Sequence, residues 1–356
     1  GLAQCFQNLN HSQRAFECYN RSIDIKKSLD DKQGVANSLS NLSMYYKSLC
    51  EYGKAIATAK EAVEYFTMVE NPLGEFRNKT HLAMYQVIVG YFDDAKANLL
   101  QALDFMKAIN DYKYIGTVYR YLGLVELNTQ NWKTAQEFFI KALEFQKKAE
   151  FRPALESTTL FLGLSYFYDE QYDLADKFIT KAVQVTERRT NAAFYGKTGK
   201  LIQLMLKSKM GECNENDIDD LVKEIEKEVI RGMNIFSERN FNVETSPIKR
   251  EHWYISQCYL NLGLTEKSEK YKKLAYDDMI IFSECIEDDK IRNDYLTLPL
   301  LHRKIRGEDL NPVNKVLEDS ISEKEEVNVF LFCPSCGFNN EKQFKFCPKC
   351  GLALSS

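Results

Sequence analysis

The sequence predicts an all-α protein whose larger part is a right-handed solenoid of stacked helical hairpins, followed by a small C-terminal module. Small residues recur every 40 residues through the first half of the chain, and the apolar residues between them recur at i, i+3, i+4 and i+7. An internal period of about 20–50 residues is typical of stacked repeats, and this apolar spacing is typical of amphipathic helices. One hairpin cannot bury its apolar face alone, so consecutive hairpins are expected to stack.

The composition is that of an ordinary globular protein, with 44% hydrophobic and 28% charged residues in a chain of 356. The 47 basic and 51 acidic residues give a net charge of -4, which is no global signal for nucleic acid or a membrane surface. No stretch approaches the roughly 18 apolar residues of a membrane span. Six of the ten cysteines are scattered singly, which favours a reducing, cytoplasmic location over a secreted disulfide scaffold.

Several sequence columns repeat at the 40-residue interval and define the packing register. One column holds only alanine: Ala15, Ala55, Ala95, Ala135 and Ala175. Seven residues later comes a second column of small residues: Ser22, Ala62, Ala102, Ala142 and Ala182. A leucine lies thirteen residues before each alanine and a small residue follows it: Leu2-Ala3, Leu42-Ser43, Leu82-Ala83, Leu122-Gly123 and Leu162-Gly163. An aromatic residue lies three residues before the later alanines: Tyr52, Phe92, Trp132 and Tyr172. Small side chains let two helix backbones approach, so these columns are expected at helix crossings.

Each repeat unit is predicted to contain two helices, which in one unit span roughly 34–52 and 53–69. After residue 190 the period slips. A degenerate pair is expected at 193–210 and 217–236, where Asp217 is the predicted N-cap of a lengthened second helix.

A more regular pair follows at 247–282, in which Ser268 takes the small-residue role and Ala275 lies seven residues on. A last helix, roughly 288–305, is expected to cap the array. The segment after it carries seven acidic and three basic residues and indicates a solvated linker. The predicted domains are regular repeats at 1–190, degenerate repeats and cap at 191–305, the linker at 306–329 and the C-terminal module at 330–356.

The repeat columns resemble the tetratricopeptide repeat in its long form of about 40 residues. The pattern leucine-small-x-x-aromatic of that family stands at Leu42-Ser43-Met44-Tyr45-Tyr46 and again at 162–166, and "DDKQGVA" at 30–36 is similar to its connector. Gln86 and Glu126 depart from the family at a column that is usually aromatic. The long-repeat group includes Pins-type and kinesin-light-chain-like adaptors, bacterial peptide receptors, and arrays appended to signalling ATPases and nucleotide cyclases. The chain begins at Gly1 in the middle of an apparent helix, so we expect it to be part of a longer protein.

The resemblance implies a concave groove lined by the first helix of each pair, which would bind a peptide or a partner domain. Groove positions carried over from the family are Asn37, Asn41, Met44, Arg77, His81, Met84, Thr117, Arg120, Tyr121, Ser157, Leu160 and Phe161. The two arginines could hold a carboxylate of an acidic peptide through bidentate hydrogen bonds. The alternative is that Arg77 and Arg120 are ordinary solvated helix charges.

The C-terminal module carries two Cys-x-x-Cys pairs separated by ten residues, Cys333/Cys336 and Cys347/Cys350. Two such pairs in tight turns supply the four thiolates of a tetrahedral zinc site, and glycine follows each pair. The segment resembles a short zinc ribbon. One structural Zn²⁺ is therefore expected, with no open coordination position for hydrolysis. The alternative is a pair of redox dithiols, but no thioredoxin-like surroundings support it.

No catalytic constellation stands in the sequence, since the four histidines are isolated and "YGKTGK" lacks the first glycine of a phosphate-binding loop. We therefore expect a non-enzymatic scaffold or adaptor, the sensor or adaptor arm of a larger signalling protein. The alternative is a nucleic-acid-associated regulator. Three lysines interleave with three phenylalanines in the ribbon, as on single-strand stacking surfaces, although the basic patch is weak: Phe338, Lys342, Phe344, Lys345, Phe346 and Lys349.

Overall fold

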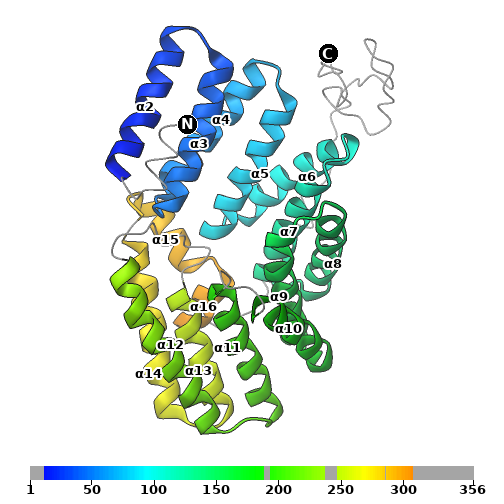
Figure 1. The fold of residues 1–356 in the computed structure, drawn as a ribbon, viewed down its shortest axis with the longest axis vertical. Helices are drawn as coiled ribbons and strands as arrows, with labels where there is room; N and C mark the ends of the chain where they lie inside the picture. Colours follow the sequence, from blue (N-terminus) through cyan, green and yellow to red (C-terminus); the bar gives the residue numbers. More distant parts are fainter. Residues whose placement is uncertain (1–11, 188–192, 237–246, 285, 308–356) are drawn as a thin grey trace.

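The computed structural model describes residues 12–187, 193–236, 247–284 and 286–307, and these form helices joined by short turns, with no strand among them. Figure 1 shows the helical hairpins following one another around an arc, from α2 at the upper left to α14 at the lower left. Helices α15 and α16 lie between the two ends of this arc. The all-α hairpin array predicted from the sequence is confirmed for the described residues.

The helices follow a regular order in the first half and a less regular order afterwards. The first group is α2 (Ser12–Ser28), α3 (Lys32–Ser48), α4 (Tyr52–Met68), α5 (Pro72–Val89), α6 (Phe92–Ala108), α7 (Tyr112–Asn128), α8 (Trp132–Lys148), α9 (Arg152–Tyr168) and α10 (Tyr172–Glu187). The second group is α11 (Ala193–Met210), α12 (Glu215–Phe236), α13 (Pro247–Asn261), α14 (Thr265–Ser283), α15 (Asp289–Thr297) and α16 (Leu300–Arg306).

A 20-residue spacing underlies the 40-residue repeat. Most helices from α2 to α9 span 17 residues, and a residue with left-handed backbone lies in the turn after each. These residues are Asp30, Cys50, Glu70, Gly90, Asn110, Gln130, Glu150 and Glu170. The backbone N–H of the next residue returns to a carbonyl five positions earlier, as Asp31 does to Lys26 at 2.9 Å. This closure is the Schellman motif, and its repetition gives every inter-helix turn the same shape.

The packing columns lie at helix crossings, as predicted. All five alanines of the alanine column are fully buried. A Cβ added to Gly123 would lie 2.6 Å from the Phe139 ring, and one added to Gly163 would lie 2.6 Å from the Ile179 side chain. Glycine at these positions is therefore needed for the close approach of neighbouring helices.

The two residues that depart from the repeat family are buried and satisfied by polar partners. Gln86 accepts a hydrogen bond from Asn98 at 3.0 Å. Glu126 pairs with Lys96 at 2.8 Å and accepts a hydrogen bond from Asn131 at 2.7 Å. The partners lie on an adjacent helix, as Asn98 and Lys96 do on α6, or in the next turn, as Asn131 does, so local polar contacts replace the packing of an aromatic side chain.

The first helices of successive hairpins contact each other, α3 on α5, α5 on α7, α7 on α9 and α9 on α11. Successive second helices of the described hairpins share fewer contacts. The array therefore curves toward the first helices. We call the side-chain surface of α3, α5, α7 and α9 that no neighbouring helix covers the inner face.

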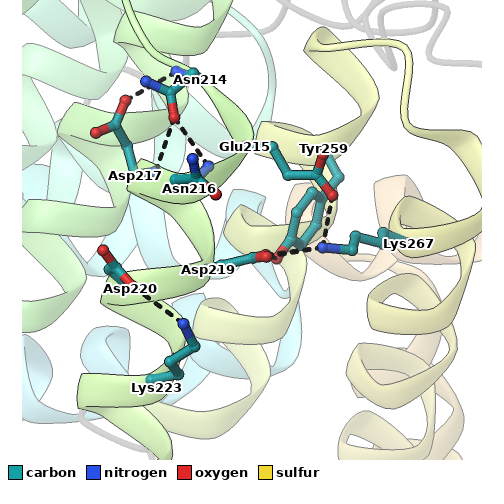
Figure 2. A network of polar contacts seen from close by, with 9 residues as sticks. All are labelled: Asn214, Glu215, Asn216, Asp217, Asp219, Asp220, Lys223, Tyr259 and Lys267. Carbon is teal, nitrogen blue, oxygen red and sulfur yellow. Dashed lines mark hydrogen bonds and ion pairs between the residues drawn. The ribbon is translucent and has the colours of Figure 1, made fainter.

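Helix α12 begins two residues earlier than predicted, and Asp217 is not its N-cap. The Asn214 side chain accepts hydrogen bonds from the backbone N–H groups of Asn216 and Asp217, while the Asp217 carboxylate accepts one from the Asn214 N–H at 2.8 Å (Figure 2). The cap is thus Asn214, and Asp217 completes a reciprocal pair three residues later.

The same helix is joined to the next hairpin by a charged network (Figure 2). The Asp219 carboxylate accepts hydrogen bonds from the Tyr259 hydroxyl at 2.5 Å and from Lys267 at 2.9 Å. Glu215 also pairs with Lys267, at 2.7 Å. The two donors hold the pKa of Asp219 below its ordinary value.

The end of the array differs from the single capping helix that was expected. Residues 286–307, which we call the closing segment, form two short helices because Pro299 interrupts the helical pattern. The segment does not only cover the last hairpin. It runs back across the turns of four earlier hairpins.

Each of those four hairpins contributes a contact to the closing segment. Tyr52 stacks on Tyr295 with 6.3 Å between ring centroids. The Tyr91 hydroxyl donates to Asp294 at 2.8 Å, and Leu298 lies against Gly90. The backbone N–H of Leu300 donates to the Asn128 side chain at 3.1 Å, and the Lys304 ammonium lies 3.8 Å from the centroid of the Tyr168 ring.

Candidate functional site

The inner face begins with an exposed stripe on α3. Asn37, Asn41 and Met44 are exposed, while the residues on either side of each are mostly buried. Their spacing of four and three residues places them on one side of the helix. Met44 exposes 47% of its surface, although a thioether side chain is usually found in a core. This stripe offers two amides and one flexible apolar side chain to a partner.

On α5 the predicted groove residue Arg77 is already engaged. Its guanidinium donates to the Asp111 carboxylate at 3.0 Å and lies 4.9 Å from the centroid of the Tyr114 ring. Both partners belong to the next hairpin, at the start of α7. Arg77 therefore links two repeat units, and its side chain is still partly exposed. An acidic ligand would have to compete with Asp111 for its guanidinium.

His81 lies one helical turn after Arg77 and is partly buried. Burial, together with the positive charges of Arg77 and Lys47, lowers the pKa of His81 to about 4. The imidazole is therefore neutral at pH 7. Its Nδ1 atom is buried and makes no hydrogen bond within the described part of the chain.

The predicted residues on α7 and α9 are less accessible. Tyr121 exposes only 3% of its surface and belongs to the hydrophobic core. Arg120 stacks over it at 4.3 Å. Phe161 is partly buried and stacks on Phe139 at 6.1 Å. Tyr121 is therefore a support for Arg120 and not an open contact residue.

The inner face thus changes along the array. The equivalent positions 41, 81, 121 and 161 run from an exposed Asn through a partly buried His to a buried Tyr and a partly buried Phe. Of the twelve groove positions carried over from the family, Asn37, Asn41 and Met44 are exposed, Arg77, His81, Thr117, Arg120 and Phe161 are partly exposed, and Met84, Tyr121, Ser157 and Leu160 are buried. The most open portion is formed by α3 and α5.

Sequence reasoning missed three residues that define the electrostatics of this surface: Lys47, Asp111 and Tyr114. Asp111 caps α7, and its side chain accepts from the Tyr114 N–H at 3.2 Å. The sequence could have predicted Asp111 as the N-cap of α7, because aspartate is a preferred N-cap residue. Its pairing with Arg77 could not be predicted, because that contact depends on how two hairpins stack. That geometry is not present in the linear pattern.

The described residues hold no group of three or more His, Cys, Asp or Glu side chains that could bind a metal ion. The four cysteines of the predicted zinc ribbon, and the linker beyond residue 307, lie outside the described residues. Within the described helices, none is long and apolar enough to span a bilayer. Four cysteines of the described part, Cys18, Cys50, Cys213 and Cys258, form no disulfide.

Comparison with solved structures reveals similar helical arrays. RapI in its apo form is similar over 77% of this chain and 94% of its own, with a TM-score of 0.62 and 14% identity. Aspartyl phosphate phosphatase F from Bacillus subtilis is similar over 77% of this chain and 67% of its own, with a TM-score of 0.61 and 12% identity. A Podosopora anserina putative kinesin light chain with TPR-like repeats gives a weaker likeness, with a TM-score of 0.43, 13% identity, and coverage of 54% and 93%.

No protein-family model and no curated protein matches the sequence. The structural neighbours are tetratricopeptide-like repeat proteins, so the predicted fold of the array is confirmed. At this level of identity the likeness establishes the fold alone, and the activity named for the phosphatase stays with that protein.

Proposed function

We propose that this chain is a non-enzymatic interaction scaffold that binds a peptide or an extended partner segment on the inner face of α3 and α5, as an arm of a larger signalling protein. The exposed stripe of Asn37, Asn41 and Met44 carries this proposal. Amide side chains can pair with both N–H and C=O groups of an extended peptide. A methionine adapts its shape to varied apolar side chains.

Charge favours an acidic segment as the ligand. Lys47, Arg77 and Arg120 are cationic side chains in or beside this part of the inner face, and Arg77 is paired with Asp111. The neutral His81 adds no charge at pH 7. Binding should therefore weaken as salt is added, because exposed charges are screened within about 10 Å at 0.1 M ionic strength.

The experiment is selection of peptides from a random display library on the full chain, followed by calorimetric titration of the selected peptide. Met44→Ala should weaken binding about tenfold, since hot-spot truncations cost roughly 1–2 kcal/mol. Met68→Ala is the matched control, because Met68 is 65% exposed but lies at the end of the second helix α4. Equal losses for both variants, or none for Met44→Ala, would exclude the inner face as the binding surface.

For the C-terminal module we propose one structural Zn²⁺ held by Cys333, Cys336, Cys347 and Cys350. The support is the spacing of the four cysteines and the closed donor set of four thiolates. Elemental analysis of the purified chain should give about one zinc per molecule. A Cys347→Ser variant that keeps its full zinc content would contradict this assignment.

A further inference from the structure

A cavity of about 530 Å³ lies away from the inner-face stripe, where the closing segment meets the second half of the array. Its walls come from the α9–α10 turn, α11, α13 and α16. The lining residues are Phe167, Tyr168, Glu170, Tyr172, Met205, Lys209, Trp253, Gln257, Asn261, Lys304 and Gly307. The size is within the usual range of small-molecule sites, about 300–1,000 Å³.

Lys304 is the unusual member of this lining. Its ammonium lies over the Tyr168 ring at 3.8 Å, and no carboxylate of the described residues pairs with it. Burial lowers the pKa of Lys304 to about 8. At pH 7 the side chain is still mostly protonated, so the cavity holds a partly desolvated cation that lies over an aromatic face.

The remaining walls divide into an apolar part and a polar part. Trp253, which is 7% exposed, lines the cavity together with Tyr172 and Phe167, whose ring centroids lie 5.9 Å apart. Gln257 and Asn261 add amides from α13. Lys209 adds a second cation from α11, and Glu170, which is exposed, is the one carboxylate of the lining.

We propose that this cavity binds a small organic anion, with its carboxylate or phosphate head group on Lys304 and Lys209 and its apolar body against Trp253 and Tyr172. An unpaired cation in an aromatic pocket is poorly solvated, so an incoming anion gains an ion pair without displacing an existing one. The apolar walls favour a ligand with a hydrocarbon or ring body over a free inorganic anion. The site joins the closing segment to α9, α10, α11 and α13, so its ligand also stabilises the packing of the closing segment on these helices.

The test uses octanoate, octyl phosphate and 1-octanol as probes of the full chain. The chain has two tryptophans, so Trp132→Phe leaves Trp253 as the one fluorescence reporter. Octanoate or octyl phosphate should change this fluorescence saturably, with 1-octanol at least tenfold weaker; the stronger of the two anions identifies the head group. Equal binding of 1-octanol would overturn the proposal.

Variants of the lysine separate charge from shape. Lys304→Met should weaken the anion at least tenfold, while Lys290→Met, an exposed lysine of the same closing segment, should leave its affinity unchanged. The titratable groups that line the cavity are Tyr168, Glu170, Tyr172, Lys209 and Lys304. Raising the pH to 9 should weaken binding in the parent chain and not in Lys304→Arg, because arginine keeps its charge. Unaltered affinity in Lys304→Met would refute the site.

Discussion

The regular hairpins and the closing segment differ in the sequence separation of the contacts that hold them in place. From α3 to α10 each helix packs mainly on its sequence neighbours, through columns that recur every 40 residues. The closing segment instead contacts residues far back in the chain, as in the Lys54–Glu287 pair, 233 residues apart. The first kind of packing can extend without limit, whereas the second fixes where the array ends and how far it curves.

Because of this difference, a single substitution has different structural consequences in the two regions. A change in a repeat column disturbs a helix crossing that its neighbours share. A change under the closing segment disturbs the tie between distant hairpins and leaves each hairpin intact. Variants of the two regions should therefore differ in how much they lower the free energy of unfolding and in which helices they disturb.

The largest effect is expected for Ala135→Leu in the alanine column. Ala135 is fully buried at a helix crossing, so the added atoms force overpacking that costs about 3 kcal/mol. Ala97→Leu is the control, because Ala97 is exposed on α6 and leucine is nearly as good a helix former. Thermal unfolding of both variants measures the difference. Equal melting temperatures would show that the register of the columns is wrong.

The next effect is a dependence of stability on pH at His81. The pKa of His81 is about 4 in the folded chain and about 6.5 when unfolded, so the unfolded state takes up a proton first as the pH falls. Stability should therefore drop between pH 6.5 and pH 4 by about 2–3 kcal/mol and change no further below that window.

A His81→Gln variant isolates this contribution, because the other titrating groups are common to both proteins. Urea unfolding at pH 7 and at pH 4.5 gives the comparison. The variant should lose less stability than the parent chain over this interval. An equal loss in both would mean that His81 titrates normally.

A smaller effect is expected where the closing segment meets the array. Gly90 has φ +94, and a Cβ there would lie 2.3 Å from Leu298. Gly90→Ala combines the strain of a left-handed backbone with this contact, so it should lower the free energy of unfolding by about 2 kcal/mol. Gly211→Ala and Gly263→Ala have φ +76 with nothing nearby, and each should cost about 1 kcal/mol.

The excess cost of Gly90→Ala measures the docking of the closing segment. Adding Leu298→Gly to Gly90→Ala should recover part of that excess, since it removes the Leu298 Cβ that the new methyl group would strike. Denaturant unfolding of the parent chain and the four variants supplies the values. Three equal single-variant costs would mean that Leu298 does not rest on Gly90 in solution.

The sequence predicted the array well because its evidence is periodic. The alanine column and the helix pair around residue 42 follow from local spacing, and α11 begins and ends at the predicted residues. The closing segment could not be predicted in this way. Its contacts with Tyr91 and Asn128 join residues that share no repeat position, and the Arg77–Asp111 pair depends on the stacking of two hairpins. Asp217 was misassigned as a cap because Asn214, three residues earlier, was equally suited.

The contrast between the two regions bears on function, because the closing segment covers turns and leaves the α3 stripe exposed. Methyl-labelled methionine spectra test this most directly, since the chain has eight methionines. Addition of the selected peptide should shift the methyl signal of Met44, on the inner face, and leave that of Met68, on α4, in place. A shift of Met68 with an unmoved Met44 would contradict the claim that the inner face is the interaction surface.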